Sequence, residues 1–242
     1  MLRLPRLFLL SLLLACLAPE ASARAQEDRV FTTEELIDGF NKTVFGLEYR
    51  SWSWRPYQVK KYTRPVRFYV HNPARIDRRP TVQAFLRQLE SKISGIEVEL
   101  AESPESANFE IFVVDRADYL TTVREQVYRK ASADAPGRCL VRVVSGRDGI
   151  KRSTSVIVSD EGEFIFRRCM VEETLQGLGP MNDDTSLTHS VFNDESRHNR
   201  FTAFDRLLLN MLYDPRIRPG MSRKDTDALL PLILRDLRAR LP

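Results

Sequence analysis

The stretch CMVEETLQGLGPMND, residues 169–183, decides how this chain is interpreted. Its helical spacing predicts a helix from about Phe164 to Leu178, which two glycines and a proline then end. One stripe of that helix carries Ile165, Cys169, Glu172 and Gln176. A stripe of this kind normally faces the core, where a carboxylate and an amide are costly unless they find partners. The two polar side chains therefore need a reason to be there.

The spacing of the stretch is that of a zinc protease helix. In such a helix two histidines four residues apart point at one zinc ion, and a glutamate beside the first is the base for the metal-bound water. The extended form, HExxHxxGxxH, adds a glycine turn and a third ligand. In that register the chain has Glu172, Glu173, Gln176, Gly179 and Asn182. Glu173 becomes the candidate general base, and the other three polar residues stand at the ligand positions.

The residue types change the expected chemistry. Carboxylate and amide oxygens replace the imidazole nitrogens that zinc prefers, so zinc affinity should fall sharply and Glu173 would have no activated water. We therefore expect no cofactor and no metal, and a vestigial site in which Glu172, Glu173 and Gln176 form a hydrogen-bonded cluster. Its partners are expected in the Asn182-Asp183-Asp184 loop. An oxygen-rich calcium or magnesium site remains an alternative.

Two further residues belong to this hypothesis. His189 is the histidine nearest in sequence to the altered site, and it could serve as a replacement ligand or simply lie in a loop. Met221 looks like the methionine that underlies the metal in zincin-like enzymes. The alternative for Met221 is an ordinary core position beside Leu229 and Leu230.

Three blocks of sequence carry a family resemblance: FIFRRCMVEETLQGLGPMND (164–183), HSVFND (189–194) and FTAFDRLLLNMLYDPRIRPGM (201–221). Together they resemble the bacterial family catalogued as domain of unknown function 2927, over about residues 35–240. That resemblance implies a relative of the zincin-like metallopeptidases with substituted metal ligands. It implies no settled function.

The remaining patterns predict an α+β fold. Before the quoted stretch we expect strands at 65–70, 96–100 and 109–114, and a hairpin at 139–144 and 154–158. Helices are expected at 33–44, at 80–94 and over 115–130, the last starting after Asp115 as its cap and running to about Lys130. After it we expect helices capped by Thr202 and by Ser222, the last running over 223–240. Strands first and helices last around one core indicate a single α+β domain with a mixed sheet and C-terminal helices. With the family resemblance, its architecture would be zincin-like.

The first residues predict export. A basic start and an apolar run (Leu7–Ala18) too short to span a bilayer are typical of a secretory signal peptide. Small residues allow cleavage after Ala25, with Ala23 as the alternative site. Residues 1–25 are then the signal and 26–242 the mature domain. The alternative is a lipobox, in which a lipidated Cys16 anchors the chain to a bacterial membrane.

The net charge of the mature chain argues against nucleic acid as a partner. Removing residues 1–25 takes away three of the 37 basic and one of the 33 acidic residues, and the net charge of about +2 that remains gives no electrostatic footprint for nucleic acid.

Cys139 and Cys169 are the two remaining cysteines, and an even count in an exported chain favours a disulfide over two buried thiols. Closing a loop of about 30 residues would stabilise the fold by roughly 3 kcal/mol.

Residues 48–64, EYRSWSWRPYQVKKYTR, are aromatic and basic without a clear period. We expect an extended arm over the core whose cations reach solvent. Stacking on nucleic acid or sugar is the alternative.

These observations predict an exported, non-catalytic, zincin-like protein, periplasmic or secreted, that binds another protein or an envelope component through the former cleft. An atypical metal-dependent hydrolase is the rival hypothesis, with Glu173 as base and Glu172, Asn182 or His189 holding the metal. A third is an envelope lipoprotein of structural use, which would touch a membrane only through Cys16.

Overall fold

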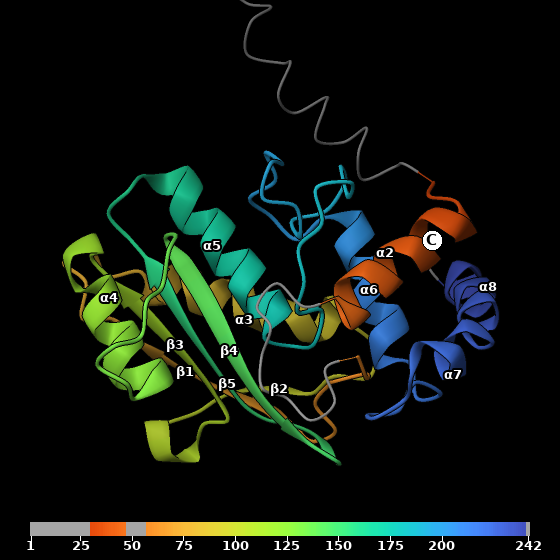
Figure 1. The fold of residues 1–242 in the computed structure, drawn as a ribbon, viewed down its shortest axis with the longest axis horizontal. Coiled ribbons are helices and arrows are strands. Elements are labelled where there is room, and N and C mark those ends of the chain that lie inside the picture. The colour runs from red at the N-terminus through yellow and green to blue at the C-terminus, as the bar shows by residue number, and fades with distance from the viewer. Residues whose placement is uncertain (1–29, 47–56, 241–242) are drawn as a thin grey trace, which may run out of the picture. The chain divides into compact units, whose positions relative to one another are not determined.

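The computed structural model describes residues 30–46 and 57–240, and residues 32–242 form one compact unit. At its centre lies a five-stranded sheet in the order β2-β1-β3-β5-β4 (Figure 1). The strands are β1 (Val66–His71), β2 (Val98–Leu100), β3 (Phe109–Val114), β4 (Cys139–Gly146) and β5 (Gly149–Val158). All pairs are parallel except β4 with β5, which form the predicted hairpin at one edge.

The helices surround this sheet as an α+β fold requires. They are α2 (Thr33–Phe45), α3 (Arg79–Lys92), α4 (Tyr119–Thr122), α5 (Glu163–Gln176), α6 (Ala203–Tyr213), α7 (Arg223–Asp227) and α8 (Leu230–Arg240). Helix α3 packs on β1 and β2, and α5 packs on β5 and β4, while α2, α6 and α8 pack on one another beside the sheet (Figure 1). Among the described residues, no helix combines the length and apolar character that crossing a membrane needs.

Alternating residues of β3 face two different helical layers. Phe112 and Val114 pack with Tyr119 and the π-helix η3 (Val123–Tyr128) that continues α4. Phe109 points the other way, because a Cβ atom on Gly177, just after α5, would lie 2.3 Å from its ring. Since neighbouring side chains of a strand point to opposite faces, α4 and α5 cover opposite faces of the sheet.

The predicted starts of α2, α6 and α7 are confirmed, and each has a capping box. Thr32, Thr202 and Ser222 each accept a hydrogen bond from the backbone three residues on, and the acidic residue there bonds back. These signals are local, so they act before any tertiary contact forms.

Two predicted helices are wrong in their continuity. The helix expected over 115–130 is divided into η2 (Arg116–Asp118), α4 and η3, and Asp115 does not cap it because its carboxylate binds Arg75 instead. The helix expected over 223–240 is interrupted at residues 228–229, between α7 and α8. Pro231, in the first turn of α8, has no N–H to donate to the carbonyl oxygen four residues earlier, so one helix cannot run through this point unbroken.

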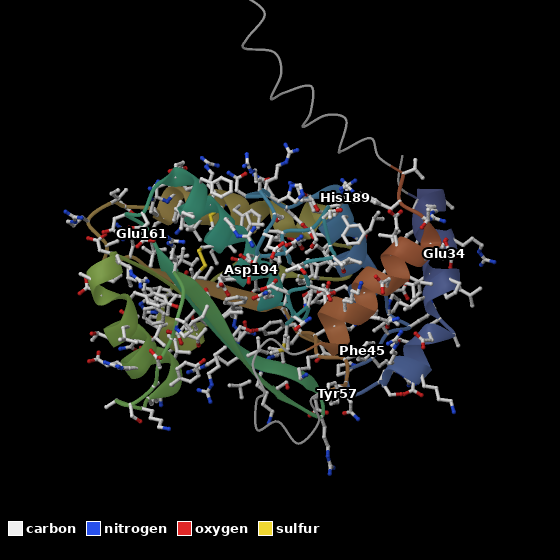
Figure 2. The ribbon with its side chains drawn as sticks, turned by 45° about the horizontal axis from the view of Figure 1, so that its top comes forward. Glu34, Phe45, Tyr57, Glu161, His189 and Asp194 are labelled. Atoms are coloured by element: carbon white, nitrogen blue, oxygen red, sulfur yellow. A yellow bond between two sulfur atoms is a disulfide. The ribbon has the colours of Figure 1, made fainter. Side chains whose placement is uncertain are left out.

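The predicted disulfide is confirmed. Cys139 at the start of β4 and Cys169 in α5 are bonded, with their Cα atoms 5.7 Å apart; Figure 2 draws the bond in yellow. The bond therefore joins the edge of the sheet to the helix that covers it.

The arm at 48–64 is described only from Tyr57 onward. There the expectation fails for Lys60 and Lys61, which are only 8% and 7% exposed, whereas Arg64 does reach solvent. The predicted signal peptide, Cys16 and the two tryptophans lie outside the described residues.

The close approach of α5 to the sheet can be tested at Gly177. We expect Gly177→Ala to lower the free energy of unfolding by about 1–3 kcal/mol, because the new methyl group meets the fully buried ring of Phe109. In a Phe109→Leu background the same change should cost clearly less. Urea unfolding of wild type, the two single variants and the double variant measures the cost of Gly177→Ala in each background. Equal costs in the two backgrounds would contradict the contact between Gly177 and Phe109.

Candidate functional site

Helix α5 is buried along its second half, from Arg168 to Gln176. It ends where the sequence predicted. Gly179 adopts a φ of +141°, and a Cβ atom there would lie 2.3 Å from the carbonyl oxygen of Lys60. Only glycine fits this position, so the chain must leave the helix axis at this point and begin the loop that faces the polar side of α5.

The polar side of α5 is organised by Arg168, which was not singled out from the sequence. Its side chain is 10% exposed, and Nη2 donates to Glu172 Oε1 at 3.1 Å, one helical turn away. A guanidinium always carries its charge, so burial demands acceptors. The i,i+4 spacing of an arginine and a glutamate on a buried helix was the available signal for this pair.

Arg168 also holds the loop of residues 184–198, here called the 184–198 loop. Its Nη2 donates to the carbonyl oxygen of Asn193 at 3.0 Å, and Nη1 donates to the carbonyl and hydroxyl oxygens of Ser196 at 3.3 and 3.2 Å. Longer contacts reach the carbonyl oxygens of Val191 and His198. One buried cation thus replaces the regular hydrogen bonding that this loop lacks.

A buried carboxylate, that of Asp205, is also hydrogen-bonded to the 184–198 loop. Asp205, in the first turn of α6, accepts hydrogen bonds from the Ser190 hydroxyl and from the Val191 backbone N–H. Burial raises the pKa of Asp205, while the hydrogen bonds from Ser190 and Thr202 oppose that rise. The capping box Thr202–Asp205 signalled this acid in the sequence, but only as a helix cap.

Gln176 and Asn182 are tied to protein groups. Gln176 Nε2 donates to Asp183 Oδ1 at 3.0 Å, which links α5 to the loop where the polar cluster was expected. Asn182 turns toward α2, where Nδ2 donates to the carbonyl oxygen of Lys42 at 3.0 Å. It therefore packs on the C-terminal end of α2 and adds a second hydrogen bond to a carbonyl oxygen that also accepts one from the Gly46 N–H.

The candidate base Glu173 is 6% exposed. The carboxylates that come together beside it are those of Glu172, Asp183 and Asp194, with oxygen atoms within 4.8 Å of one another. Glu173 is not part of that group.

Two of the three histidines lie in the 184–198 loop and the third lies on the sheet. His189 lies half-buried in the 184–198 loop (Figure 2), and His198 in the same loop bonds the carbonyl oxygen of Thr188 at 3.0 Å. His71 lies on the sheet, where Nε2 meets Glu110 Oε2 at 2.9 Å. His71 and His198 each contact a protein group, and within the part of the chain that the structure describes the one cluster of three possible metal ligands contains no histidine.

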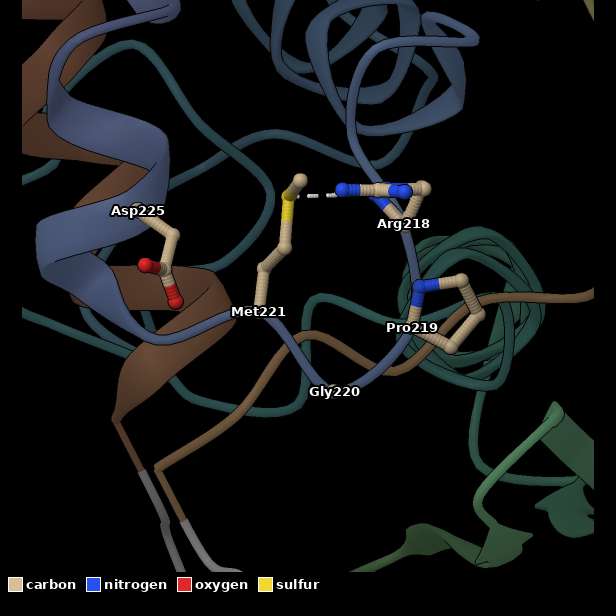
Figure 3. Close-up of a pocket in the computed structure, with 5 residues that line it drawn as sticks. All are labelled: Arg218, Pro219, Gly220, Met221 and Asp225. Carbon is tan, nitrogen blue, oxygen red and sulfur yellow. Dashed lines mark hydrogen bonds between the residues drawn. The ribbon is translucent and has the colours of Figure 1, made fainter.

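Met221 lies in the loop between α6 and α7. Its sulfur accepts a hydrogen bond from the backbone N–H of Arg218 at 3.3 Å, and its carbonyl oxygen accepts one from Val59. Met221 and Arg218 line an open depression with Pro219, Gly220 and Asp225 (Figure 3). Met221 is thus hydrogen-bonded to its own turn and to residue 59.

The three clustered carboxylates do not fit a zinc site. Arg168 Nη2 lies 3.1 Å from Glu172 and 3.5 Å from Asp194, so a protein cation is already paired with two of them. All three offer oxygen, whereas zinc in such sites prefers nitrogen and sulfur. A zinc ion would have to compete with a guanidinium that also holds the loop in place.

Lys61 is a second buried cation that the sequence did not reveal. Its Nζ donates to the carbonyl oxygens of Leu212 and Asp214, at 3.0 and 3.1 Å, and so closes the C-terminal end of α6. Burial lowers the pKa of this amine to about 8, while the charge of Asp214 opposes the shift.

Comparison with known proteins gives one match. The family model described as "Protein of unknown function (DUF2927)" matches residues 33–232. No curated protein and no solved structure matches the chain.

Removing the cation of the site should be costly. We expect Arg168→Met to lower the free energy of unfolding by roughly 3 kcal/mol or more, because Glu172 is left buried without its counter-charge. The neighbouring Arg167 is half exposed and pairs with Glu163, so Arg167→Met should cost less than about 1 kcal/mol. Urea unfolding measures both, and equal losses would refute the role of Arg168.

Lys61 gives a pH dependence with a defined sign. Its pKa of about 8 in the folded chain lies below the ordinary value of 10.5, so above pH 8 the folded state loses its proton first and the unfolded state binds more protons. The stability of wild type relative to Lys61→Met should therefore rise, by on the order of 2 kcal/mol between about pH 7.5 and about pH 9.5. A difference that stays constant or falls would show that the buried amine is not desolvated.

Proposed function

The chain belongs to the family described as Protein of unknown function (DUF2927), and we propose that it is a non-catalytic, exported member with a zincin-like architecture. In this proposal α5 keeps the spacing of a metal-binding helix but uses it to hold a loop. The loop, in turn, forms a binding surface for another protein or a cell-envelope component.

One observation carries the proposal: Arg168 takes the place of a metal as the counter-charge of Glu172 and Asp194. A metal in a zincin site lowers the pKa of a bound water, so that a neighbouring glutamate can activate it. A guanidinium offers hydrogen-bond donors and a positive charge, as a metal ion does in sign, but it does not activate a water molecule as a nucleophile. The remaining ligand positions, Gln176 and Asn182, are occupied with Asp183 and the end of α2.

The binding role rests on the 184–198 loop. Loops fixed on a rigid scaffold are the usual place for recognition, because little conformational freedom is lost on binding. The exposed side chains of the loop are Thr185, Ser186, Thr188, Asp194, Glu195 and Arg197. They are hydroxyl and charged groups, which suit a polar partner. Export itself rests on the predicted signal peptide, with anchoring through Cys16 as the alternative.

The rival hydrolase has one observation in its favour, the three carboxylates whose oxygens lie within 4.8 Å of one another. For catalysis, a metal would have to displace Arg168 from Glu172. It would also have to bring a water to Glu173, which is not one of the three.

Metal content separates the two. The protein purified from its own periplasm, and Glu172→Ala combined with Gln176→Ala, would be assayed for zinc, manganese, calcium and magnesium. We expect no stoichiometric metal in either, because Arg168 competes for the carboxylates. The pair Glu90→Ala with Gln88→Ala, exposed on α3, is the matched control. A stoichiometric metal present in wild type and control but lost from the Glu172 and Gln176 variant would overturn the vestigial-site reading and direct the search to a hydrolase.

A further inference from the structure

The disulfide lies directly beside the residue that holds the 184–198 loop. Cys169 follows Arg168 in α5, and its sulfur joins Cys139, the first residue of β4. Cys169 is buried and packs toward the sheet, whereas Arg168 reaches the loop. The same turn of α5 is therefore bonded covalently to the sheet and by hydrogen bonds to the loop.

The sheet side of this connection is an edge. β4 occupies the end of the strand order and pairs with β5, so the residues at its start are held by one neighbouring strand and by the disulfide. Edge strands open more easily than central ones, because fewer hydrogen bonds must break. Once the bond is reduced, the start of β4 and the turn of α5 opposite it are free to move apart.

The loop side tolerates little movement. Arg168 reaches Asn193 and Ser196 of the loop at 3.0 to 3.3 Å. Hydrogen bonds weaken steeply beyond such distances, so a shift of about 1 Å in the helix would break several of them together. The loop has no helix or strand of its own within residues 184–198 to fall back on.

We propose that the Cys139–Cys169 bond places the 184–198 loop under redox control: reduction loosens the loop while the sheet stays folded. The inference is independent of the proposed function. A dithiol reductant attacks the half-buried Cys139 sulfur, the S–S bond breaks, and the Cys169 thiolate leaves and takes up a proton. The second thiol then releases Cys139, so two cysteine thiols and one disulfide of the reductant are formed.

Amide hydrogen exchange of the mature protein tests this, with and without dithiothreitol. We expect exchange at Asp184, Val191 and Ser196, whose N–H groups are bonded within the loop or to Asp205, to accelerate at least about tenfold on reduction. Ile111 and Val113 in the centre of β3 should be unaffected. Faster exchange in β4 alone would overturn the proposal, and so would equal acceleration in β3, which would mean global unfolding.

Two variants check the route of coupling. Cys139→Ser with Cys169→Ser should exchange like the reduced protein whether or not dithiothreitol is present. Arg168→Met should show fast loop exchange even when oxidised, with little further change on reduction. If the loop of Arg168→Met stayed as protected as in wild type, Arg168 could not be the link, and the proposal would fail.

Discussion

The buried guanidinium of Arg168 is the interaction on which the rest of this structure depends. It cannot lose its charge, so every unmet donor would be a large penalty in a buried place. One carboxylate from the same helix and backbone carbonyls from the 184–198 loop meet that demand. The loop is consequently folded around the cation, with carbonyl groups turned inward that would otherwise face water.

A second charge of opposite sign makes the arrangement specific. Asp205 accepts the N–H of Val191, and Arg168 contacts the carbonyl oxygen of the same residue. If the loop slipped by one residue, both contacts would be lost. A buried donor and a buried acceptor would then be left unpaired. Two buried charges are a poor source of stability, but they are well suited to selecting one conformation for a segment without secondary structure.

This arrangement also explains the blocks that carry the family resemblance. Their polar residues have structural partners: Glu172 with Arg168, Gln176 with Asp183, Ser190 with Asp205, and Tyr213 with the carbonyl oxygen of Leu178. The spacing of these polar residues along α5 thus has a structural reason, because the helix has to present polar groups to the loop that follows it.

Local signals in the sequence predicted the fold well, and long-range partners could not be predicted. The capping boxes, the hairpin and the end of α5 depend on neighbours within a few residues. The failure at Asp115 arose because its partner, Arg75, is 40 residues away in the sequence. Pro231 was a local signal that the helical pattern around it concealed. For the site, Glu172 and Gln176 were identified, but Arg168, Asp205 and Lys61 were not, since a charged residue in a helix or arm is usually solvated.

The central claim is that Arg168 and Glu172 act as one unit, and a double-mutant cycle tests it most directly. Arg168→Met, Glu172→Gln and their combination would be compared with wild type by urea unfolding at neutral pH. The account predicts a coupling free energy of roughly 2 kcal/mol, so that the second substitution costs little once the first is made. Additive losses would contradict it, and would mean that the two side chains are held independently.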